Sequence, residues 1–349
     1  MKNKKQSIII ASIIIILLII IVVFLVIKKD DKKPILKPKA KEIIKEVQII
    51  DEKSKTRPFA IMINNINEAR KVQSSLNKAY IVYEIVVEGG LTRYLALYKD
   101  VPEAVIGSVR SARHYFLDYV LENDAIYVHW GWSPQAQSDI RNLKINNING
   151  LTYEGVYFYR TKNIGAPHNG FTNMELLAKA REKLKYSVET EKENLLKYSA
   201  EPVKLNTYES VQDADSVNIT YSQNTKIKYE YDQESLKYIR FQDGIKQIDH
   251  ENNDGVLVKN IIIYQIANYG LNDGMNKGRQ DINNVDSGTG YYVSEGKAIK
   301  INWSKESRSA QTIYTDEKGE RLILNDGNTF IQIVPTTGKV EIIKNETVS

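Results

Sequence analysis

The stretch "AVIGSVRSARHYFLDYVLEN", residues 104–123, places an apolar run, a glycine-serine loop and an amphipathic segment in succession. The same order returns in "AIYVHWGWSPQAQSDIRNL", residues 125–143, and in "VYFYRTKNIGAPHNGFTNMELLAKAREKL", residues 156–184. Each of the three reads as a strand, a glycine loop and a helix. Alternation of this kind predicts an α/β domain, with a mainly parallel or mixed sheet that is covered by helices.

The expected helix starts carry recognisable capping residues. Ser133 followed by Pro134 fits an N-cap with proline at the first helical position. Thr172 with Glu175 fits a capping box, in which the two side chains satisfy backbone N–H groups reciprocally. Both patterns support helices after the second and third loops.

In the first loop, two arginines stand where a helix is expected to begin. If Ser108 caps that helix, Arg110 and Arg113 lie in its first turn, where unpaired N–H groups already carry about half a positive charge. A phosphate or carboxylate between the arginines would reverse this repulsion, because it accepts bonds from helix N–H groups and guanidinium groups together. The alternative is that the arginines pair internally with carboxylates, for which the candidates are Glu84, Glu88 and Asp118.

The three loops are expected to meet, since ligands bind open α/β sheets outside the carboxyl ends of the strands. His129 and His168 lie in or beside the second and third loops and are the candidates for an acid or base. No metal-ligand spacing is present, so neither a metal nor a cofactor is predicted. The expected ligand-binding residues of the loops are Ser108, Arg110, Ser111, Arg113 and Asn169.

A hairpin is predicted before these loops. "AYIVYEIVV", residues 79–87, joins "LTRYLALY", residues 91–98, through a short glycine turn between two β-rich runs. Glu84 and Glu88 are expected to share one face, and Arg93 is placed to pair with one of them. All three are candidate ligand-binding residues, and a solvated cross-strand ion pair is the alternative.

The N-terminal segment is almost entirely apolar. "IIIASIIIILLIIIVVFLVI", residues 8–27, would span roughly 30 Å as a helix, the thickness of a bilayer core. We therefore expect a single transmembrane helix at residues 7–27, a cytoplasmic N-terminus at residues 1–6 and a lysine-rich stalk at residues 28–54. A bare lysine count around the span favours a cytoplasmic body, whereas the resemblance described below favours an extracytoplasmic one.

The composition excludes several classes of function. Lysine and arginine number 48 against 43 aspartates and glutamates, and lysines beside the apolar run supply much of the excess, so nucleic-acid binding is not expected. The chain has no cysteine, which excludes disulfides, thiolate zinc sites and a lipid-modified cysteine.

The later part of the chain reads as a series of short strands. We expect an α/β domain at residues 55–186, a polar linker at residues 187–204 and a smaller β-rich domain at residues 205–345. A fragment of about residues 55–200 is expected to fold alone. Two hairpins are predicted in the second domain, in "YYVSEGKAIKINW", residues 291–303, and "RLILNDGNTFIQIV", residues 321–334.

Several motifs occur in a fixed order along the chain. They are "RPFAIMINN" (57–65), "AYIVYEIVVEGGLTRYLALY" (79–98), "IGSVRSAR" (106–113), "VHWGW" (128–132), "PHNGF" (167–171), "INWSK" (301–305) and "LNDGNTFIQIVP" (324–335). Together they resemble the YerB-like bacterial lipoproteins, a family that is also known as domain of unknown function 3048. The resemblance implies an envelope location and two domains, and it implies no chemistry. The apolar helix would take the place of the lipid here.

Two classes of function follow from the sequence. In the first, an extracytoplasmic protein anchored in the membrane binds a phosphate- or carboxylate-bearing envelope component at the strand-end loops; if it is an enzyme, the chemistry is hydrolysis or phosphoryl transfer. In the second, it is a non-catalytic scaffold or partner in an envelope assembly, and its arginines serve internal ion pairs only.

Overall fold

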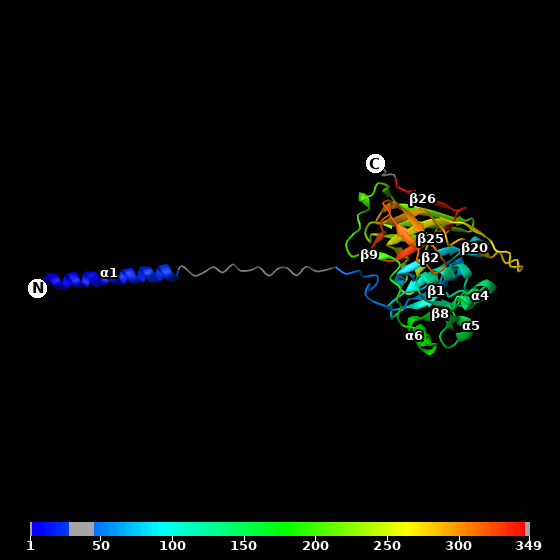
Figure 1. Ribbon diagram of the computed structural model, residues 1–349, viewed down its shortest axis with the longest axis horizontal. Coiled ribbons are helices and arrows are strands. Elements are labelled where there is room, and N and C mark those ends of the chain that lie inside the picture. Colours follow the sequence, from blue (N-terminus) through cyan, green and yellow to red (C-terminus); the bar gives the residue numbers. More distant parts are fainter. Residues whose placement is uncertain (1, 28–44, 163, 346–349) are drawn as a thin grey trace. The chain divides into compact units, whose positions relative to one another are not determined.

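The computed structural model describes residues 2–27, 45–162 and 164–345 of the chain. It divides into two units, Met1–Ile44 and Lys45–Ser349. The described part of the first unit is the helix α1 (Lys2–Ile27), and the second unit contains all the sheets (Figure 1).

The N-terminal helix α1 includes residues 2–6, which are predicted to form a cytoplasmic terminus. Within the described residues, no helix combines the length and the apolar character that crossing a membrane requires. The single-pass helix predicted at residues 7–27 is therefore not supported by the structure.

A mixed sheet of eleven strands is the largest element of the second unit, and both halves of the sequence contribute strands to it. One strand, β23 (Ile313–Thr315), pairs with β22 outside the main path. From one edge to the other the order is β10 (Gln212–Asp213), β22 (Lys297–Ser304), β21 (Ser287–Ser294), β18 (Asn260–Ile266), β25 (Thr329–Pro335), β2 (Ile81–Val86), β3 (Thr92–Tyr98), β1 (Phe59–Asn64), β5 (Ile126–His129) and β6 (Asn147–Asn149).

Strand β25 joins the two halves of this sheet. It runs parallel to β18 on one side and to β2 on the other, where Gln332 lies opposite Glu84. Every residue of β1, β2, β3 and β25 is buried, as expected for strands that are covered on both faces. The hairpin predicted at residues 321–334 is wrong, because its second strand pairs with β18 and β2 instead.

The α/β region and the β-rich region that the sequence predicts are both present, and they share one sheet. The boundaries predicted between them, at residues 186 and 205, stay predictions. The folded unit begins earlier than residue 55, since Ile50 is buried and the backbone N–H groups of Gln48 and Ile49 donate to the Asp326 carboxylate. Residues 45–54 are therefore not part of a stalk, and the rest of the predicted stalk lies outside the described residues.

Smaller sheets flank the large one. A six-stranded antiparallel sheet contains only strands from the second half of the chain, and three pairs and a triplet complete the set. The six-stranded sheet has the order β14 (Ile245–Lys246), β13 (Lys237–Gln242), β12 (Thr225–Asp232), β11 (Ser216–Ser222) and β26 (Lys339–Ile343), with β17 (Leu257–Val258) beside β13; the others are β4 (Val105–Gly107), β8 (Gly170–Asn173) and β7 (Tyr159–Arg160), β15 (Ile248–Asp249) with β16 (Asp254–Gly255), β19 (Asn268–Gly270) with β20 (Gln280–Ile282), and β24 (Ile323–Asn325) with β9 (Lys197–Ser199).

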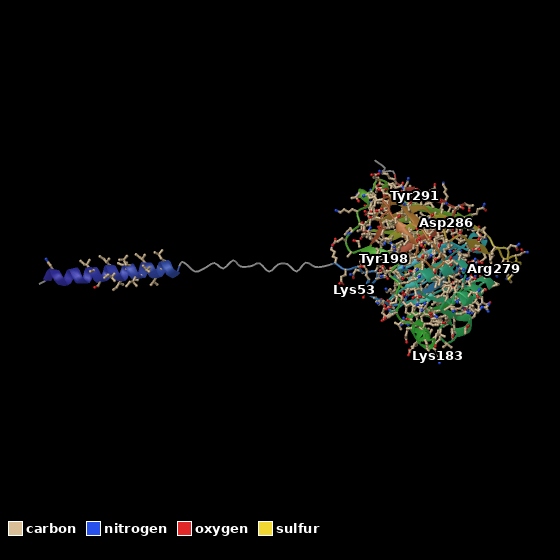
Figure 2. All side chains as sticks on the ribbon, in the orientation of Figure 1. Lys53, Lys183, Tyr198, Arg279, Asp286 and Tyr291 are labelled. Atoms are coloured by element: carbon tan, nitrogen blue, oxygen red, sulfur yellow. The ribbon has the colours of Figure 1, made fainter. Side chains whose placement is uncertain are left out.

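The helices of the second unit are short. In Figure 1, α4, α5 and α6 lie at one end of this unit and β26 lies at the other, and Lys183 at the end of α6 lies on the surface (Figure 2). The helices are α2 (Asn67–Arg70), α3 (Leu117–Glu122), α4 (Pro134–Asn142), α5 (Gly150–Tyr153) and α6 (Met174–Lys183), with 3-10 turns η1 (Leu76–Lys78), η2 (Glu88–Gly90), η3 (His114–Phe116) and η4 (Leu205–Thr207).

Two predicted hairpins are confirmed. Strands β2 and β3 pair antiparallel through η2, and β21 pairs antiparallel with β22. The η2 turn requires glycine, because Gly89 and Gly90 both have φ near +69° and a Cβ on Gly90 would lie 2.6 Å from Ser222 Oγ.

Only the second strand-loop-helix unit has the predicted arrangement, with α4 between the parallel strands β5 and β6. The strands of the first and third units, β4, β7 and β8, form a separate antiparallel sheet. A mixed sheet with helices is therefore confirmed, and a mainly parallel one is wrong.

The predicted helix caps have different outcomes. Ser133 caps α4, where its Oγ accepts a hydrogen bond from the backbone N–H of Ala136 at 3.2 Å. The cap of α6 is Asn173 instead of Thr172, and the Thr172 hydroxyl donates to the carbonyl of Tyr157 at 2.8 Å. The predicted capping box is wrong by one residue.

Candidate functional site

The segment that follows β4 is extended, whereas a helix start was expected there. The backbone N–H groups of Val109 and Arg110 donate to the carbonyls of Gly170 and Met62, each at 2.8 Å. These groups are therefore bonded to neighbouring strands, and the helical turns begin only with η3, after Arg113. Ser108 is not a helix cap, and its fully buried hydroxyl has no partner within the described part of the chain.

The three glycine loops nevertheless lie side by side, as the sequence predicts. The backbone N–H of Trp130 donates to the carbonyl of Arg110 at 3.0 Å, and the Ser111 hydroxyl donates to the carbonyl of Trp130 at 3.0 Å. Because Val109 bonds to Gly170, the segment after β4 contacts both other loops. The loops thus bring together residues that are far apart in the sequence, such as Val109 and Gly170, which are 61 positions apart.

Glu88 is the carboxylate at the centre of this region. It accepts hydrogen bonds from Arg113, with Nε to Oε1 at 2.5 Å and Nη2 to Oε2 at 2.9 Å. Arg93 approaches the same carboxylate, with Nη2 at 3.6 Å from Oε2, and its Nη1 donates to the carbonyl of Ser111 at 2.7 Å. The predicted pairing of Arg93 is confirmed, and it is not solvated, since the Arg93 side chain is only 8% exposed.

Arg110 adds a third cation beside this pair. Among the residues that the structure describes, no carboxylate lies within salt-bridge distance of Arg110. Burial and the charge of Arg113 lower the pKa of Arg110, while Glu88 opposes them. Burial and Arg113 also lower the pKa of Arg93 to about 9, against the opposing charge of Glu88. We call Arg93, Arg110 and Arg113 the arginine cluster; three guanidinium groups there face one carboxylate.

His168 lies next to the arginine cluster. Its Nδ1 accepts a hydrogen bond from the Asn64 amide at 3.0 Å, so the neutral ring carries its proton on Nε2. Burial and then the charge of Arg110 lower the pKa of His168, and Glu68 opposes this shift. His168 is partly exposed, so it is the predicted acid or base that solvent can reach.

His129 lies in a different environment. It is fully buried, with Nδ1 donating to the carbonyl of Gly131 at 2.8 Å and Nε2 at 3.1 Å from Asn147 Oδ1. Burial lowers its pKa to about 4, although both hydrogen bonds oppose the shift. The ring is therefore neutral at physiological pH, and its one N–H, on Nδ1, holds the end of β5 through the Gly131 carbonyl. The structure does not bring His129 to a surface where a substrate could reach it.

Glu84 belongs to a separate, completely buried network. Its carboxylate accepts hydrogen bonds from Arg240 Nη2 at 3.0 and 2.8 Å, and from the side chains of Asn65 and Thr92. Glu84 and Glu88 therefore do not share a site, contrary to the prediction. No local pattern in the sequence marks Arg240, which lies 156 residues from Glu84.

Two further predicted residues have structural partners. Asn169 accepts from Arg160 Nη1 at 2.9 Å and donates to the carbonyl of Thr161 at 3.3 Å. Asp118, the alternative partner of the arginine cluster, pairs with Arg308 at 2.7 Å. Among the described residues, no group of three or more histidine, cysteine, aspartate or glutamate side chains is placed to hold a metal ion.

Comparison with known proteins finds one family, whose two domain models match two successive parts of the chain. The family models for the N-terminal and C-terminal domains of the protein of unknown function DUF3048 match residues 46–187 and 217–331. The chain is 32% identical over 291 residues to "Putative lipoprotein YerB" of Bacillus subtilis (strain 168), covering 83% of this chain and 85% of that protein. The chain belongs to the DUF3048 family.

The DUF3048 fold seen here is also similar to a solved structure. The crystal structure of the YerB protein from Bacillus subtilis matches with a TM-score of 0.71 at 32% identity, covering 82% of this chain and 94% of that one. The resemblance read from the sequence motifs is thereby confirmed, together with a two-part architecture of a mixed sheet with helices and a β-rich C-terminal region.

Proposed function

We propose that this DUF3048 protein is an extracytoplasmic protein of the bacterial envelope, that α1 attaches it to the membrane, and that the arginine cluster binds an anion. The similarity to a protein named as a lipoprotein supports the location. This chain has no cysteine that could carry a lipid, and α1 is the segment that we propose in its place. The excess of guanidinium groups over carboxylates in the cluster is the single observation that carries the binding proposal.

The surface of α1 supports membrane attachment. The described side chains from Ile10 to Leu25 are all exposed, and Phe24 reaches 69%. Apolar surface gains about 25 cal/mol per Å² when it leaves water, so hydrocarbon is the environment that stabilises this helix. The full-length chain should remain with membranes after alkaline carbonate washing, and a variant without residues 2–27 should not. Release of both by the wash would overturn the attachment.

Protease protection tests the location. Protease added to intact protoplasts should digest the folded unit, which begins at Lys45. Digestion only after lysis would place the body in the cytoplasm and overturn the proposal.

The geometry of the arginine cluster supports a phosphate or carboxylate ligand. Arg113 and Arg93 use part of their donor capacity on Glu88 and on main-chain carbonyls, while Arg110 has no such carboxylate among the described residues. A bound anion would offset the mutual repulsion of the three cations and accept charge-assisted hydrogen bonds. His168 is the adjacent group that could exchange a proton with such a ligand.

One observation favours a second function, that of a non-catalytic partner in an envelope assembly. Arg113 is already bound to Glu88 through two hydrogen bonds, which is what internal ion pairing requires. In that case the cluster only stabilises the loops.

Thermal melting with phosphate distinguishes the two functions. At constant ionic strength, phosphate at ten times its Kd should stabilise the full-length chain by about 1.4 kcal/mol. Arg110→Gln should keep or raise the melting temperature without phosphate, because it removes repulsion with Arg113, and should abolish the phosphate response. Arg141→Gln is the matched control, since Arg141 is an exposed arginine on α4.

The opposite result supports the partner function. Two results together would show that the arginines only pair with Glu88. The melting temperature of the parent protein would change with neither phosphate nor sulfate, and Arg113→Ala would strongly lower the stability. An equal phosphate response in Arg110→Gln and the parent would also reject the site.

A further inference from the structure

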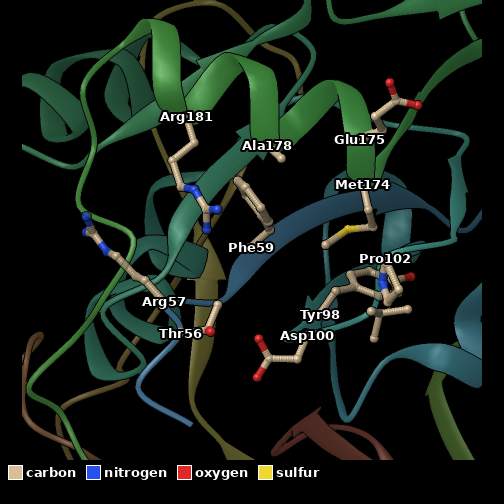
Figure 3. A pocket seen from close by; sticks show the side chains of 11 residues that line it. Thr56, Arg57, Phe59, Tyr98, Asp100, Pro102, Met174, Glu175, Ala178 and Arg181 are labelled. Atoms are coloured by element: carbon tan, nitrogen blue, oxygen red, sulfur yellow. The ribbon is translucent and has the colours of Figure 1, made fainter.

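A pocket of about 530 Å³ lies away from the arginine cluster. It is formed between α6 and the segments at the ends of β1 and β3 (Figure 3). None of the site residues predicted from the sequence lines it. Its volume is within the range of small-molecule sites, which is roughly 300–1,000 Å³.

The floor and walls of the pocket are apolar. Phe59 and Tyr98 are cross-strand partners in the register of β1 and β3. Met174 and Ala178 face them from α6, where a spacing of four residues puts both on one side of the helix. Val101 extends the wall on the side of the loop after β3. An apolar body of a few carbon atoms therefore has a surface to pack on.

Arg181 supplies a cation at one side of the pocket. It follows Ala178 on the same face of α6, and its guanidinium carbon lies 5.6 Å from the centre of the Phe59 ring. Over the described ranges of the chain, no carboxylate forms an ion pair with Arg181. The other arginine of the pocket, Arg57, donates to Asp124 and Asn146 and is thus already engaged.

Asp100 supplies an anion on the opposite side, as Figure 3 shows. The residue is exposed and held at φ 54° after the end of β3, and no ion pair to its carboxylate occurs in the part of the chain that the structure describes. The neighbouring Lys99 turns away and donates to Ser54 and Asn194. The other carboxylate of the pocket, Glu175, is bound to Lys179 at 2.5 Å.

We propose that this pocket binds a small zwitterion with an apolar body between its charges, which is a short apolar peptide with free ends. The carboxylate of the ligand binds Arg181, its ammonium group binds Asp100, and its apolar side chains pack on Phe59 and Met174. Both charges are needed in the ligand, since Arg181 and Asp100, which form no ion pair with any residue that the structure describes, place one charge of each sign across an apolar floor. This site is independent of the anion site proposed above.

Isothermal titration calorimetry with the full-length chain tests the assignment. Leucyl-leucine and leucine are the two probes, and leucine should bind more weakly, because its two charged groups share one carbon and cannot reach both sides of the pocket. N-acetyl-leucyl-leucine lacks the ammonium group, and leucyl-leucine amide lacks the carboxylate. Each should bind about tenfold more weakly than leucyl-leucine, because each loses one charge-assisted hydrogen bond.

Variants identify the residues that bind each end of the ligand. Arg181→Gln should weaken leucyl-leucine about tenfold and leave the amide unchanged, whereas Asp100→Asn should weaken leucyl-leucine and leave the acetylated form unchanged. The matched controls are Lys183→Gln on α6 and Glu103→Gln after β3, which are exposed and lie outside the pocket.

Three results would overturn the proposal: no heat from either probe at millimolar concentration, equal affinity for the free and the blocked peptides, or variants that bind as the parent does. A circular dichroism spectrum that matches the parent shows that a variant is folded before its affinity is compared.

Discussion

Arg240 donates from Nη2 to both carboxylate oxygens of Glu84, at 3.0 and 2.8 Å, and neither side chain is exposed. Glu84 lies in β2 of the large sheet, and Arg240 lies in β13 of the six-stranded sheet. The guanidinium group also lies over the rings of Tyr94 and Tyr229, at 5.3 and 5.9 Å from their centres. This ion pair therefore connects the two parts of the chain in an environment from which water is excluded.

Breaking one side of this pair should be costly. Arg240→Met leaves the Glu84 carboxylate buried without its cation, and we expect a loss of about 3–5 kcal/mol in the free energy of unfolding, measured with urea. Replacing both residues, as Glu84→Leu with Arg240→Met, should recover much of that loss. Lys179→Met is the control, because the exposed pair with Glu175 contributes under about 1 kcal/mol. If Arg240→Met and Lys179→Met lowered the free energy of unfolding equally, the result would contradict the role of the buried pair.

A fragment of residues 55–200 should not fold alone. Without the rest of the chain, β2 loses its neighbour β25 and Glu84 loses Arg240. The all-buried strand β2 would then present an unpaired apolar edge to water. We expect an aggregated fragment without a cooperative melt, in contrast to residues 45–345. A soluble fragment that melts cooperatively would show that the shared sheet is dispensable.

The carboxylate of Glu88 should make the protein sensitive to acid. Burial raises its pKa, but the hydrogen bonds and charge of Arg113 and the charge of Arg93 outweigh burial and hold the pKa of Glu88 below its usual value. A lowered pKa contributes stability above the unfolded value of about 4.5, and this contribution is lost as the pH falls through the folded value. Glu88→Gln should therefore be less stable than the parent at pH 7, and the difference should shrink below pH 4 in urea titrations. A difference that stays constant with pH would contradict this ionisation.

His168 should report on the occupancy of the arginine cluster. Burial and the charge of Arg110 lower its pKa, so an anion bound at Arg110 should raise the pKa measured by NMR. Arg110→Gln should raise it as well and remove the effect of phosphate. His129 is the internal control, since burial lowers its pKa to about 4 and phosphate should leave that value unchanged. A phosphate effect on both histidines alike would indicate unspecific screening.

The two glycines of the η2 turn should differ in their tolerance to alanine. Both have φ near +69°, but an added Cβ meets Ser222 only at Gly90 and meets open space at Gly89. Gly89→Ala should cost about 1 kcal/mol for the backbone alone, and Gly90→Ala should cost more, because the Ser222 hydroxyl donates to the Gly90 carbonyl at 2.6 Å and cannot move freely. Thermal melts that rank the variants in the reverse order would contradict the contact.

Local features of the fold could be predicted from the sequence, and distant pairings could not. The hairpin of β2 and β3 follows from glycines between two β-rich runs, and the start of α4 follows from Ser133 before a proline. The position of β25 depends on β2 and β18, which are far from it in the chain and have no pattern that specifies a partner.

The candidate site shows the same limit. The pairing of Arg93 with Glu88 was predictable, since it follows from the hairpin of β2 and β3. The loops do converge, but the strands of the first and third loops lie in a separate antiparallel sheet, so the parallel sheet edge on which the prediction rested is wrong. The helix expected after Ser108 does not form, because the backbone N–H groups of this segment find acceptors at Met62 and Gly170. Those acceptors come from strands that the loop reaches only in the folded protein.

The position of β25 also constrains how the protein is made. A ribosome synthesises β2 and β18 before β25, yet β25 is the strand that separates them in the sheet. Until the chain has emerged as far as Pro335, each of the two strands has an open apolar edge, which is the kind of surface that chaperones bind and that promotes aggregation. Folding of the large sheet must therefore be completed after synthesis of most of the chain, and premature termination before Thr329 should send the product to degradation instead of leaving a functional half.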